Sequence, residues 1–513
     1  MSLQSGIQFP ENNNGQVSTT QTGREIFSAA VGSSAHELSV SILKAHKWRK
    51  HYMTHIPKMV EVASRSETEA EAVAERGLKA CYGQFQFIRN GKKYRVQQAM
   101  EKFASNLFFT AEIQGKAPRE AFIQVNHKRK DLQGTSLRHQ IGAWIEAGII
   151  EAEHGYDVLS IVDDESSRNL VGKTFILLGA GSEVGPLKTL LSLGARVIAI
   201  ARAKPDNWKR LIAMAQETAG SLVIPCKHNP DNMNHEQIAN VAGADLLTQA
   251  PEIAYWLNEF QGPMTLGSYA YLDGAKHVQV VMAMDAIAQY LMVRRNDIAL
   301  SYLLTPSDVY SIPKSIAKHG RNRFQNQSLQ GLIKRFTYRL SAGHLYAPSI
   351  GEDIKDDKGR RLAILDNLVN QQGPNYVLAK HIQRWRAISS SKHNIKVSCN
   401  VAPASSTESV ISNQFFAAAI WGSESFGVEV FSPDTVNTLM TMQMLSDLKQ
   451  DAPQKRGEAL FVSGANHGGA WRIGYCFRSL LVPSLIVGFA KRFSLGQQLK
   501  ERLRLKKAQV SLS

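Results

Sequence analysis

Between about residues 170 and 226 the sequence alternates between β-prone apolar runs and short helical stretches. TFILLG is an apolar run of strand length, PLKTLLSLG predicts a short helix opened by Pro186 and closed by Gly194, and ARVIAIAR is a second β-branched run. This alternation is typical of parallel strands joined by helices, because parallel neighbours need a long crossover connection. We therefore predict an α/β fold with a doubly wound, mainly parallel sheet.

Length and composition exclude several classes of protein. The chain has 513 residues, of which 43% are hydrophobic and 20% charged, so it can bury a substantial core and is not disordered or collagen-like. Its four cysteines stand far apart without a CxxC pair, which excludes a Cys-rich zinc site and favours a reducing, cytoplasmic location. The polar start of the chain is unlike a secretory signal, and no apolar run reaches the ~18 residues of a membrane-spanning helix.

Changes in composition and in the pattern of apolar residues predict that the chain has four parts. Residues 1–24 are a flexible lead, and residues 25–165 are a mainly helical N-terminal domain to which the sequence assigns no chemistry. Within that domain Asn90-Gly91 predicts a hairpin, and the stretch from about 137 to 164 predicts a helix followed by a short strand. Residues 166–478 contain the alternating strands and helices, and residues 479–513 form an apolar and then basic tail.

A glycine-rich turn follows the first strand of the alternating region. Gly179, Gly181 and Gly185, with Ser182 between them, would let the backbone turn tightly and approach a pyrophosphate at the start of a helix. The alternative is a tight strand-to-helix turn without a ligand. If a dinucleotide binds here, Arg202 at the end of the second strand, with Lys204 beyond it, suits a 2′-phosphate and favours NADP(H) over NAD(H). Both could instead be solvated basic residues.

Tyr376 and Lys380 stand four residues apart in a helical stretch, and thus on one helix face. A nearby ammonium group stabilises phenolate and lowers the pKa of a tyrosine, as general acid/base catalysis requires. Chance alone gives about one such pair in a chain of this composition. The surrounding sequence must therefore indicate whether this pair is functional.

The order of these motifs resembles the short-chain dehydrogenase/reductase (SDR) family over about residues 170–470. The glycine turn comes first, YVLAK follows, a strand then ends at VAPASST, and ALFVSGANHGG predicts a last strand ending in glycines. The resemblance implies a Rossmann-like NAD(P)-binding domain with the glycines at the pyrophosphate. It implies that Tyr376 exchanges a proton with the substrate oxygen, that Lys380 holds the nicotinamide ribose, and that Pro403 to Thr407 contact the carboxamide.

The substrate-orienting serine of the family has two candidates here. IALSYLLTPSDVYS predicts a strand that ends at Thr305 and Ser307, and either hydroxyl could hydrogen-bond a carbonyl or merely cap the strand. Residues of about 310–375 would then be a long insertion that acts as a lid or pocket wall. The family's Asn-Asn-Ala-Gly is absent near 265–274, and we interpret Tyr271 and Lys276 as structural.

The sequence thus predicts an SDR-type oxidoreductase that reduces a carbonyl, or oxidises an alcohol, on a large or apolar substrate of the acyl or polyketide-like kind. The alternative is a non-catalytic NADP(H)-binding sensor or scaffold. His344, His381 and His467 lack metal-site spacing, so no metal is expected, and no nucleic-acid motif accompanies the net charge of +16. Homo-oligomers are common in the family.

The tail supports two hypotheses. Residues 480–490 are apolar except for Ser484, and seven Lys or Arg against one Glu follow between 491 and 507. This pattern suits peripheral contact with an anionic membrane. The alternative is a helix that covers the substrate pocket and ends in solvated basic residues.

Overall fold

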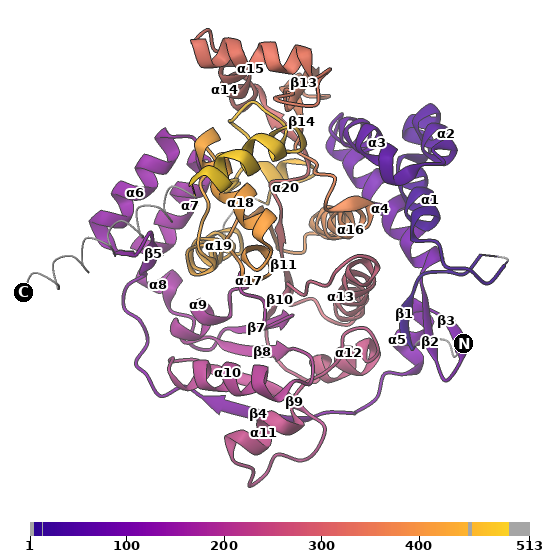
Figure 1. Cartoon of the computed structure of the whole chain (residues 1–513). Helices are drawn as coiled ribbons and strands as arrows, with labels where there is room; N and C mark the ends of the chain where they lie inside the picture. Colours follow the sequence, from indigo (N-terminus) through magenta and orange to yellow (C-terminus); the bar gives the residue numbers. More distant parts are fainter. Residues whose placement is uncertain (1–4, 13, 450–453, 492–513) are drawn as a thin grey trace, which may run out of the picture.

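The computed structural model describes residues 5–12, 14–449 and 454–491. At its centre lies a seven-stranded sheet in the order β15-β11-β10-β7-β8-β9-β4 (Figure 1). Every neighbouring pair is parallel except β4 and β9, which are antiparallel. The strands are β4 (Phe109–Gln114), β7 (Thr174–Leu178), β8 (Arg196–Ile200), β9 (Ser221–Cys226), β10 (Met264–Ser268), β11 (Ile298–Leu304) and β15 (Val397–Val401).

The sheet has a switch point where its strand order reverses. From β7 the chain moves outward in one direction through β8 and β9, and later returns to β7's other side with β10 and β11. The connections on the two sides of β7 therefore diverge at the carboxyl ends of β7 and β10, where ligands of doubly wound sheets bind in a crevice. We call this place in the fold the candidate crevice. The predicted fold class, a Rossmann-like doubly wound sheet, is confirmed.

Alternate side chains of each central strand enter two different cores. Phe175 and Leu177 of β7 pack in one apolar cluster, whereas Ile176 and Leu178 pack in the other. Both faces are therefore buried, which explains why these strands are continuous apolar runs. One face is covered by α9 (Leu187–Ser192), α10 (Pro205–Gln216) and α19 (Pro433–Asp447), and the other by α12 (Ala250–Asn258), α13 (Ala275–Arg294) and α16 (Gly373–Lys392).

The N-terminal region shares its core with the sheet. The helices α1 (Thr19–Val31), α3 (Trp48–Ala63) and α4 (Glu67–Gln84) pack beside α16 (Figure 1). A buried ion pair joins Arg386 of α16 to Asp285 of α13 at 2.7 Å, and Tyr82 of α4 donates to the same carboxylate at 2.8 Å. Tyr82 is the member of this network that belongs to the N-terminal region, so its hydrogen bond couples that region to the sheet. A hydrogen bond to a charged group contributes about 1.5–3 kcal/mol.

One N-terminal stretch is long and apolar enough to cross a membrane by length and composition alone. It runs over Thr19–Lys44 and comprises α1, the 3-10 turn η1 (Gly32–Ala35) and α2 (His36–Lys44). In this fold it is interrupted at Gly32, which has φ +39°, and Phe27 and Val31 are fully buried. Its apolar side chains therefore contribute to the core.

Two predicted local structures are wrong and one is confirmed. The Asn90-Gly91 hairpin is present between β2 (Gln86–Arg89) and β3 (Lys92–Arg95). The stretch from 137 to 164 holds no strand, but two helices, α6 (Gly134–Glu146) and α7 (Ala152–Asp163). ALFVSGANHGG is not a strand either: it forms the short helix α20 (Ala459–Val462) and a loop, and β4 adds an edge strand at the opposite side of the sheet.

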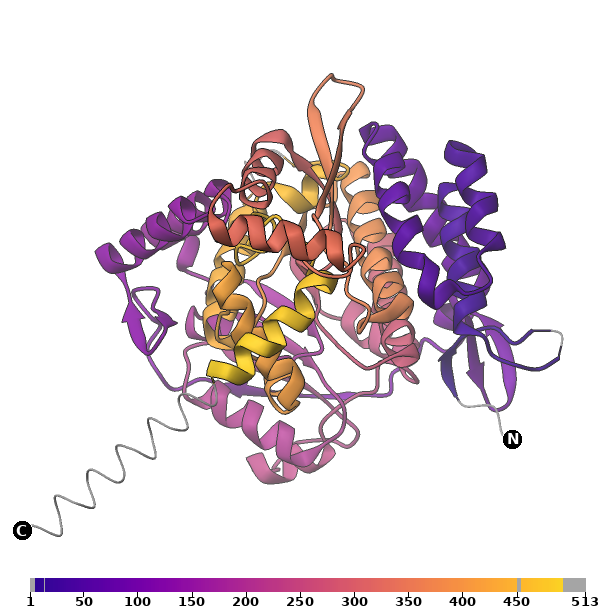
Figure 2. The same ribbon diagram turned by 45° about the horizontal axis from the view of Figure 1, so that its top comes forward.

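The residues between β11 and α16 form an appendage of their own. A three-stranded antiparallel sheet of β12 (Val309–Pro313), β14 (Arg361–Asp366) and β13 (Ile350–Lys355) carries α14 (Lys314–Phe324) and α15 (Leu329–Leu340). Beside it lie α18 (Gln414–Ser423) and a helix over 477–491 (Figure 2). Most of the basic part of the predicted tail, residues 492–513, lies outside the described residues. The four predicted parts of the chain and their boundaries stay predictions.

Candidate active site

Tyr376 lies in the first turn of α16, against the end of β11. Its phenol is hydrogen-bonded to the Thr305 side chain, which follows β11 directly. Burial raises the pKa of Tyr376 above its ordinary value, and the Thr305 hydrogen bond opposes this by favouring the phenolate. The structure thus brings together two of the predicted site residues that stand seventy-one positions apart in the sequence.

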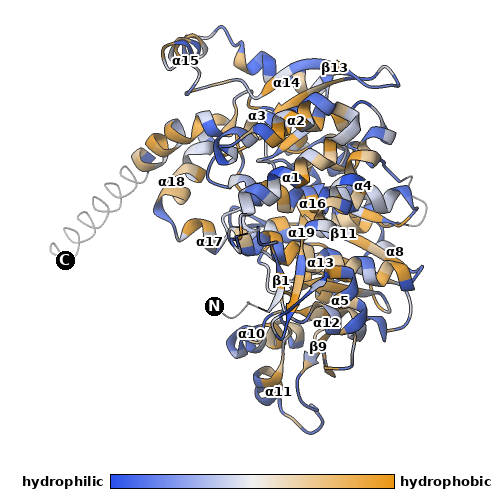
Figure 3. Ribbon diagram, turned by 90° about the vertical axis from the view of Figure 1, so that its right-hand side faces the viewer, coloured by the Kyte–Doolittle hydropathy of each residue, from blue (hydrophilic) through white to orange (hydrophobic). Residues whose placement is uncertain are grey.

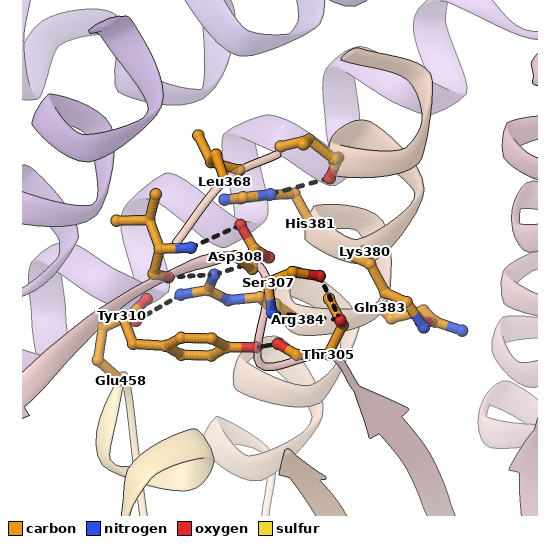
Figure 4. A network of polar contacts seen from close by, with 12 residues as sticks. Thr305, Ser307, Asp308, Tyr310, Leu368, Lys380, His381, Gln383, Arg384 and Glu458 are labelled. Atoms are coloured by element: carbon orange, nitrogen blue, oxygen red, sulfur yellow. Dashed lines mark hydrogen bonds and ion pairs between the residues drawn. The ribbon is translucent and has the colours of Figure 1, made fainter. Parts of the chain in front are cut away.

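A short chain of hydroxyl and amide groups continues from Thr305. The hydroxyls of Thr305 and Ser307 are 2.7 Å apart, and Gln372 Nε2 donates to Ser307 Oγ at 2.6 Å (Figure 4). The Tyr310 hydroxyl donates to the Thr305 carbonyl at 2.6 Å, which fixes the backbone of this turn. Thr305 contacts the tyrosine directly, whereas Ser307 stands one hydroxyl further away.

Buried charged side chains stabilise the turn that contains Thr305 and Ser307. Arg384, two turns after Tyr376 on α16, donates to the Val309 carbonyl at 2.9 Å and to Glu458 Oε2 at 2.7 Å, and lies 3.4 Å from Asp308 Oδ2 (Figure 4). Asp308 Oδ1 in turn accepts from the Val309 amide at 2.8 Å. A buried cation between two carboxylates fixes side chains in one geometry, so this network preorganises Thr305 and Ser307. The sequence analysis did not identify any of these charges.

Lys380 lies one turn beyond Tyr376, with its ammonium nitrogen 5.8 Å from the centre of the tyrosine ring. It donates to the Leu303 carbonyl at 2.9 Å and to Gln383 Oε1 at 3.2 Å. Burial lowers the pKa of Lys380 to about 8. The expected lowering of the Tyr376 pKa by this lysine is not observed, because the ammonium is directed at a carbonyl and an amide, and desolvation of the phenol dominates.

Two aromatic residues missed by the sequence analysis complete this end of the crevice. His277, in the first turn of α13, stacks on Tyr376 with ring centroids 5.5 Å apart, and Tyr271 lies against His277 at 4.7 Å. His277 is buried, and neither of its ring nitrogens has a hydrogen-bond partner among the described residues. Burial and the charge of Lys380 lower its pKa to about 3, so the imidazole is neutral. Tyr271, interpreted from the sequence as structural, is therefore a neighbour of the tyrosine.

The glycine turn lies across the switch point from these residues. Gly179 has φ +97°, and a Cβ atom there would lie 2.3 Å from the Ala270 amide nitrogen, so only glycine allows this approach of the turn to the end of β10. Ser182 and Gly185 form the following turn, in which the Gly185 amide donates to the Ser182 carbonyl at 3.2 Å. Beyond it α9 has only six residues.

The predicted phosphate-binding cations stand at the outer end of the turn. Arg202 and Lys204, just beyond β8, are both exposed. Asn207, in the first turn of α10, comes near Gly181, because a Cβ on that glycine would lie 3.3 Å from its side chain. Arg202 therefore lies at the strand end where a ribose phosphate would be bound in this fold.

The loop after β15 faces the glycine turn. It contains Pro403 and Thr407, and the next amide, that of Glu408, donates to the carboxylate of Glu183 at 3.0 Å. Glu183 belongs to the glycine turn, so this contact connects two of the predicted cofactor-binding segments. It also puts a negative charge beside the place where a pyrophosphate would lie.

Comparison with known proteins adds little to this picture. No family model and no curated protein matches the chain. A solved structure that matches is "The crystal structure of the terminal R domain from the myxalamid PKS-NRPS biosynthetic pathway", with a TM-score of 0.29 and 14% sequence identity. The match covers 60% of this chain and 68% of that chain. So weak a likeness carries no argument about function, and the roles of the individual site residues stay predictions.

Proposed function

We propose that this chain is an NADP(H)-dependent oxidoreductase of the SDR type, which reduces a carbonyl or catalyses the reverse oxidation of an alcohol. One observation carries the proposal. Tyr376, Thr305 and Lys380 meet at the carboxyl end of β11, and the glycine turn lies at the adjacent switch point of the same sheet. This combination resembles the SDR arrangement of proton donor, hydroxyl and lysine beside a dinucleotide site.

The residues present fit a dinucleotide. Gly179 shapes the turn at the carboxyl end of β7, where the backbone packs directly against Ala270, and Arg202 supplies an exposed cation at the end of β8. When bound, NADPH would supply the hydride that reduces the carbonyl carbon. The glycine turn would hold its pyrophosphate, Arg202 its 2′-phosphate, and Lys380 its nicotinamide ribose.

The chain's own groups would handle the proton. As the carbonyl oxygen gains charge, Tyr376 would donate its phenolic proton, and the Thr305 hydroxyl would steady the oxygen by hydrogen bonding. A tyrosine with a raised pKa is protonated at neutral pH, which suits reduction better than oxidation. Lys380, still charged below pH 8, would hold the nicotinamide ribose beside the tyrosine.

A second candidate function is NADP(H) binding without catalysis. The observation that favours it is the position of Lys380, whose ammonium is directed at the Leu303 carbonyl and Gln383 instead of the phenol. A sensor of this kind would bind the cofactor and show no turnover. We propose the enzyme in preference, because a binding protein has no need for a hydrogen-bonded tyrosine and threonine at this position.

The test is a titration of the purified protein with NADPH and with NADH, followed by nicotinamide fluorescence. We expect tight NADPH binding and weaker NADH binding. A panel of large apolar aldehydes, ketones and acyl thioesters should then oxidise NADPH, with absorbance as the readout. Binding of neither cofactor would contradict both candidate functions, and binding without turnover on any substrate would favour the sensor.

A further inference from the structure

The helix α15 in the appendage exposes an apolar stripe. Five large apolar side chains recur at helical spacing along it, and each is more than half exposed: Leu329, Leu332, Ile333, Phe336 and Leu340, at 74%, 51%, 56%, 64% and 72%. Its other face is the one that packs on the protein, where Tyr338 contacts Phe324 and Lys334 lies over the rings of Phe426 and Tyr475. An apolar face this continuous marks an interaction site.

The charge around this stripe has a single sign. Residues 314–340, which comprise α14 and α15, contain seven Lys or Arg and neither Asp nor Glu. Among the described residues only Arg321 of these seven lies within ion-pair distance of a carboxylate, that of Asp353. A basic segment beside an apolar helical stripe is the pattern of a helix that lies in the interface of an anionic bilayer.

Two further helices carry exposed apolar side chains. In Figure 3, α18 lies on the same side of the view as α15. On α18 these are Phe415, Phe416 and Trp421, at 67%, 42% and 40% exposure, and on the helix 477–491 they are Val482, Ile486 and Phe489, at 50%, 65% and 38%. The two helices pack together, because the rings of Phe415 and Phe489 are 5.9 Å apart and Gly422 lies directly against the backbone at Ser484. The two helices thus form a second exposed apolar patch, in addition to the stripe on α15.

This surface lies next to the candidate active site. The loop that leads into α18 begins at Thr407 and is tied to the glycine turn through Glu408 and Glu183. α14 and α15 are inserted in the chain between the Thr305–Ser307 turn and Tyr376. A partner that covers α18 would therefore stand near the glycine turn.

We propose that α15, α18 and the helix 477–491 form a docking surface for an anionic lipid bilayer. The apolar side chains enter the acyl region, and the exposed cations of α14 and α15 lie at the headgroups, namely Lys314, Lys318, Arg323 and Arg339. The inference does not depend on residues 492–513. If the proposed reductase function also holds, the substrate is an apolar carbonyl compound that enters the crevice from the membrane. A second copy of the chain is a poorer occupant, because two such basic segments would repel each other.

The experiment mixes the full chain, without cofactor, with vesicles of phosphatidylcholine alone or with added phosphatidylserine. Trp421 is a built-in reporter, since the other six tryptophans are all buried. We expect binding to the anionic vesicles, with Trp421 fluorescence quenched by brominated lipid, and no such quenching in Trp421→Phe. Raising salt from about 0.1 M to about 0.5 M should weaken binding about tenfold or more.

Two matched variants locate the surface. Leu332→Asp with Phe336→Asp should weaken vesicle binding about tenfold or more, whereas Val293→Asp, at an equally exposed valine of α13, should leave it unchanged. All these side chains are exposed, so the melting temperature should stay within a few degrees. Unchanged binding in the double variant, or association of the wild type with itself and not with vesicles, would overturn the proposal. Either result is independent of NADPH binding, so it is distinguishable from failure of the proposed function.

Discussion

The two ends of the candidate crevice are built in opposite ways. At the Tyr376 end, side chains from β11, α13 and α16 pack against one another, and Arg384 holds the turn beneath them. At the Arg202 end, the cations are exposed and the contact surface is mostly backbone, shaped by Gly179. The first end is preorganised, as acid/base chemistry requires, and the second is open, as reversible binding of a charged cofactor requires. Chemistry and affinity should therefore be separable by mutation.

The largest expected effect is on turnover. Tyr376→Phe removes the proton donor but keeps the ring that stacks on His277, so turnover should fall about 10²–10⁴-fold while NADPH affinity stays within about threefold. Steady-state rates on a substrate from the carbonyl panel and a fluorescence titration measure the two quantities. Equal losses in both would show that the two ends are not separable.

The next effect is on the backbone of the open end. Gly179→Ala should lower the free energy of unfolding by about 3 kcal/mol or more, because its Cβ would collide with the Ala270 amide. Gly172→Ala is the matched control: Gly172 has φ +78°, but nothing lies within 4 Å of its Cβ position, so only about 1–2 kcal/mol is expected. Denaturant unfolding of both variants measures these free energies. Similar losses in the two variants would show that the contact between Gly179 and the Ala270 amide leaves room for a methyl group.

The pH dependence should follow Lys380. Its pKa is lowered to about 8, so the ammonium is present below that pH and is lost above it. We expect kcat/KM for carbonyl reduction to be level below pH 8 and to fall about tenfold per pH unit above it. Lys380→Arg keeps the charge and should abolish this fall, whatever it does to the absolute rate. A profile unchanged in the arginine variant would assign the titration to another group.

A smaller effect, on NADPH affinity, is expected when the exposed cation at the end of β8 is removed. Arg202→Ala should weaken NADPH binding about tenfold and leave NADH binding nearly unchanged, because only NADPH carries the 2′-phosphate. Arg210→Ala, on the neighbouring helix α10, is the control and should affect neither. The titrations with both cofactors provide the measurement. Equal weakening of both by Arg202→Ala would show that this residue does not read the phosphate.

The smallest expected effect is a gain. Glu183→Gln keeps an acceptor for the Glu408 amide but removes a carboxylate beside the pyrophosphate position. NADPH should therefore bind about threefold more tightly, and the gain should shrink as salt is raised. If affinity falls instead, Glu183 stabilises the bound state, and the pyrophosphate does not lie where we place it.

Much of the fold could be read from the sequence because its signals are local. TFILLG and ARVIAIAR are apolar on both faces, and Asn90-Gly91 adopts the left-handed conformation that its hairpin needs. The predicted strand in ALFVSGANHGG failed because a short apolar run suits a buried helix equally well, and this stretch forms α20 beside β15. The added edge strand, β4, pairs with β9 at the opposite edge of the sheet. That pairing joins residues more than a hundred positions apart, which no local pattern reports.

The chemical groups available at the site follow from short-range spacing in the sequence: the glycines of the turn, the Tyr376–Lys380 pair on one helix face, and the hydroxyls at the end of β11. Three contacts depend on long-range packing instead. Thr305 contacts the phenol, His277 stacks on it, and Lys380 is directed at the Leu303 carbonyl. The reason is physical: desolvation and the direction of a hydrogen bond depend on neighbours brought together by packing, and these set the pKa of each group.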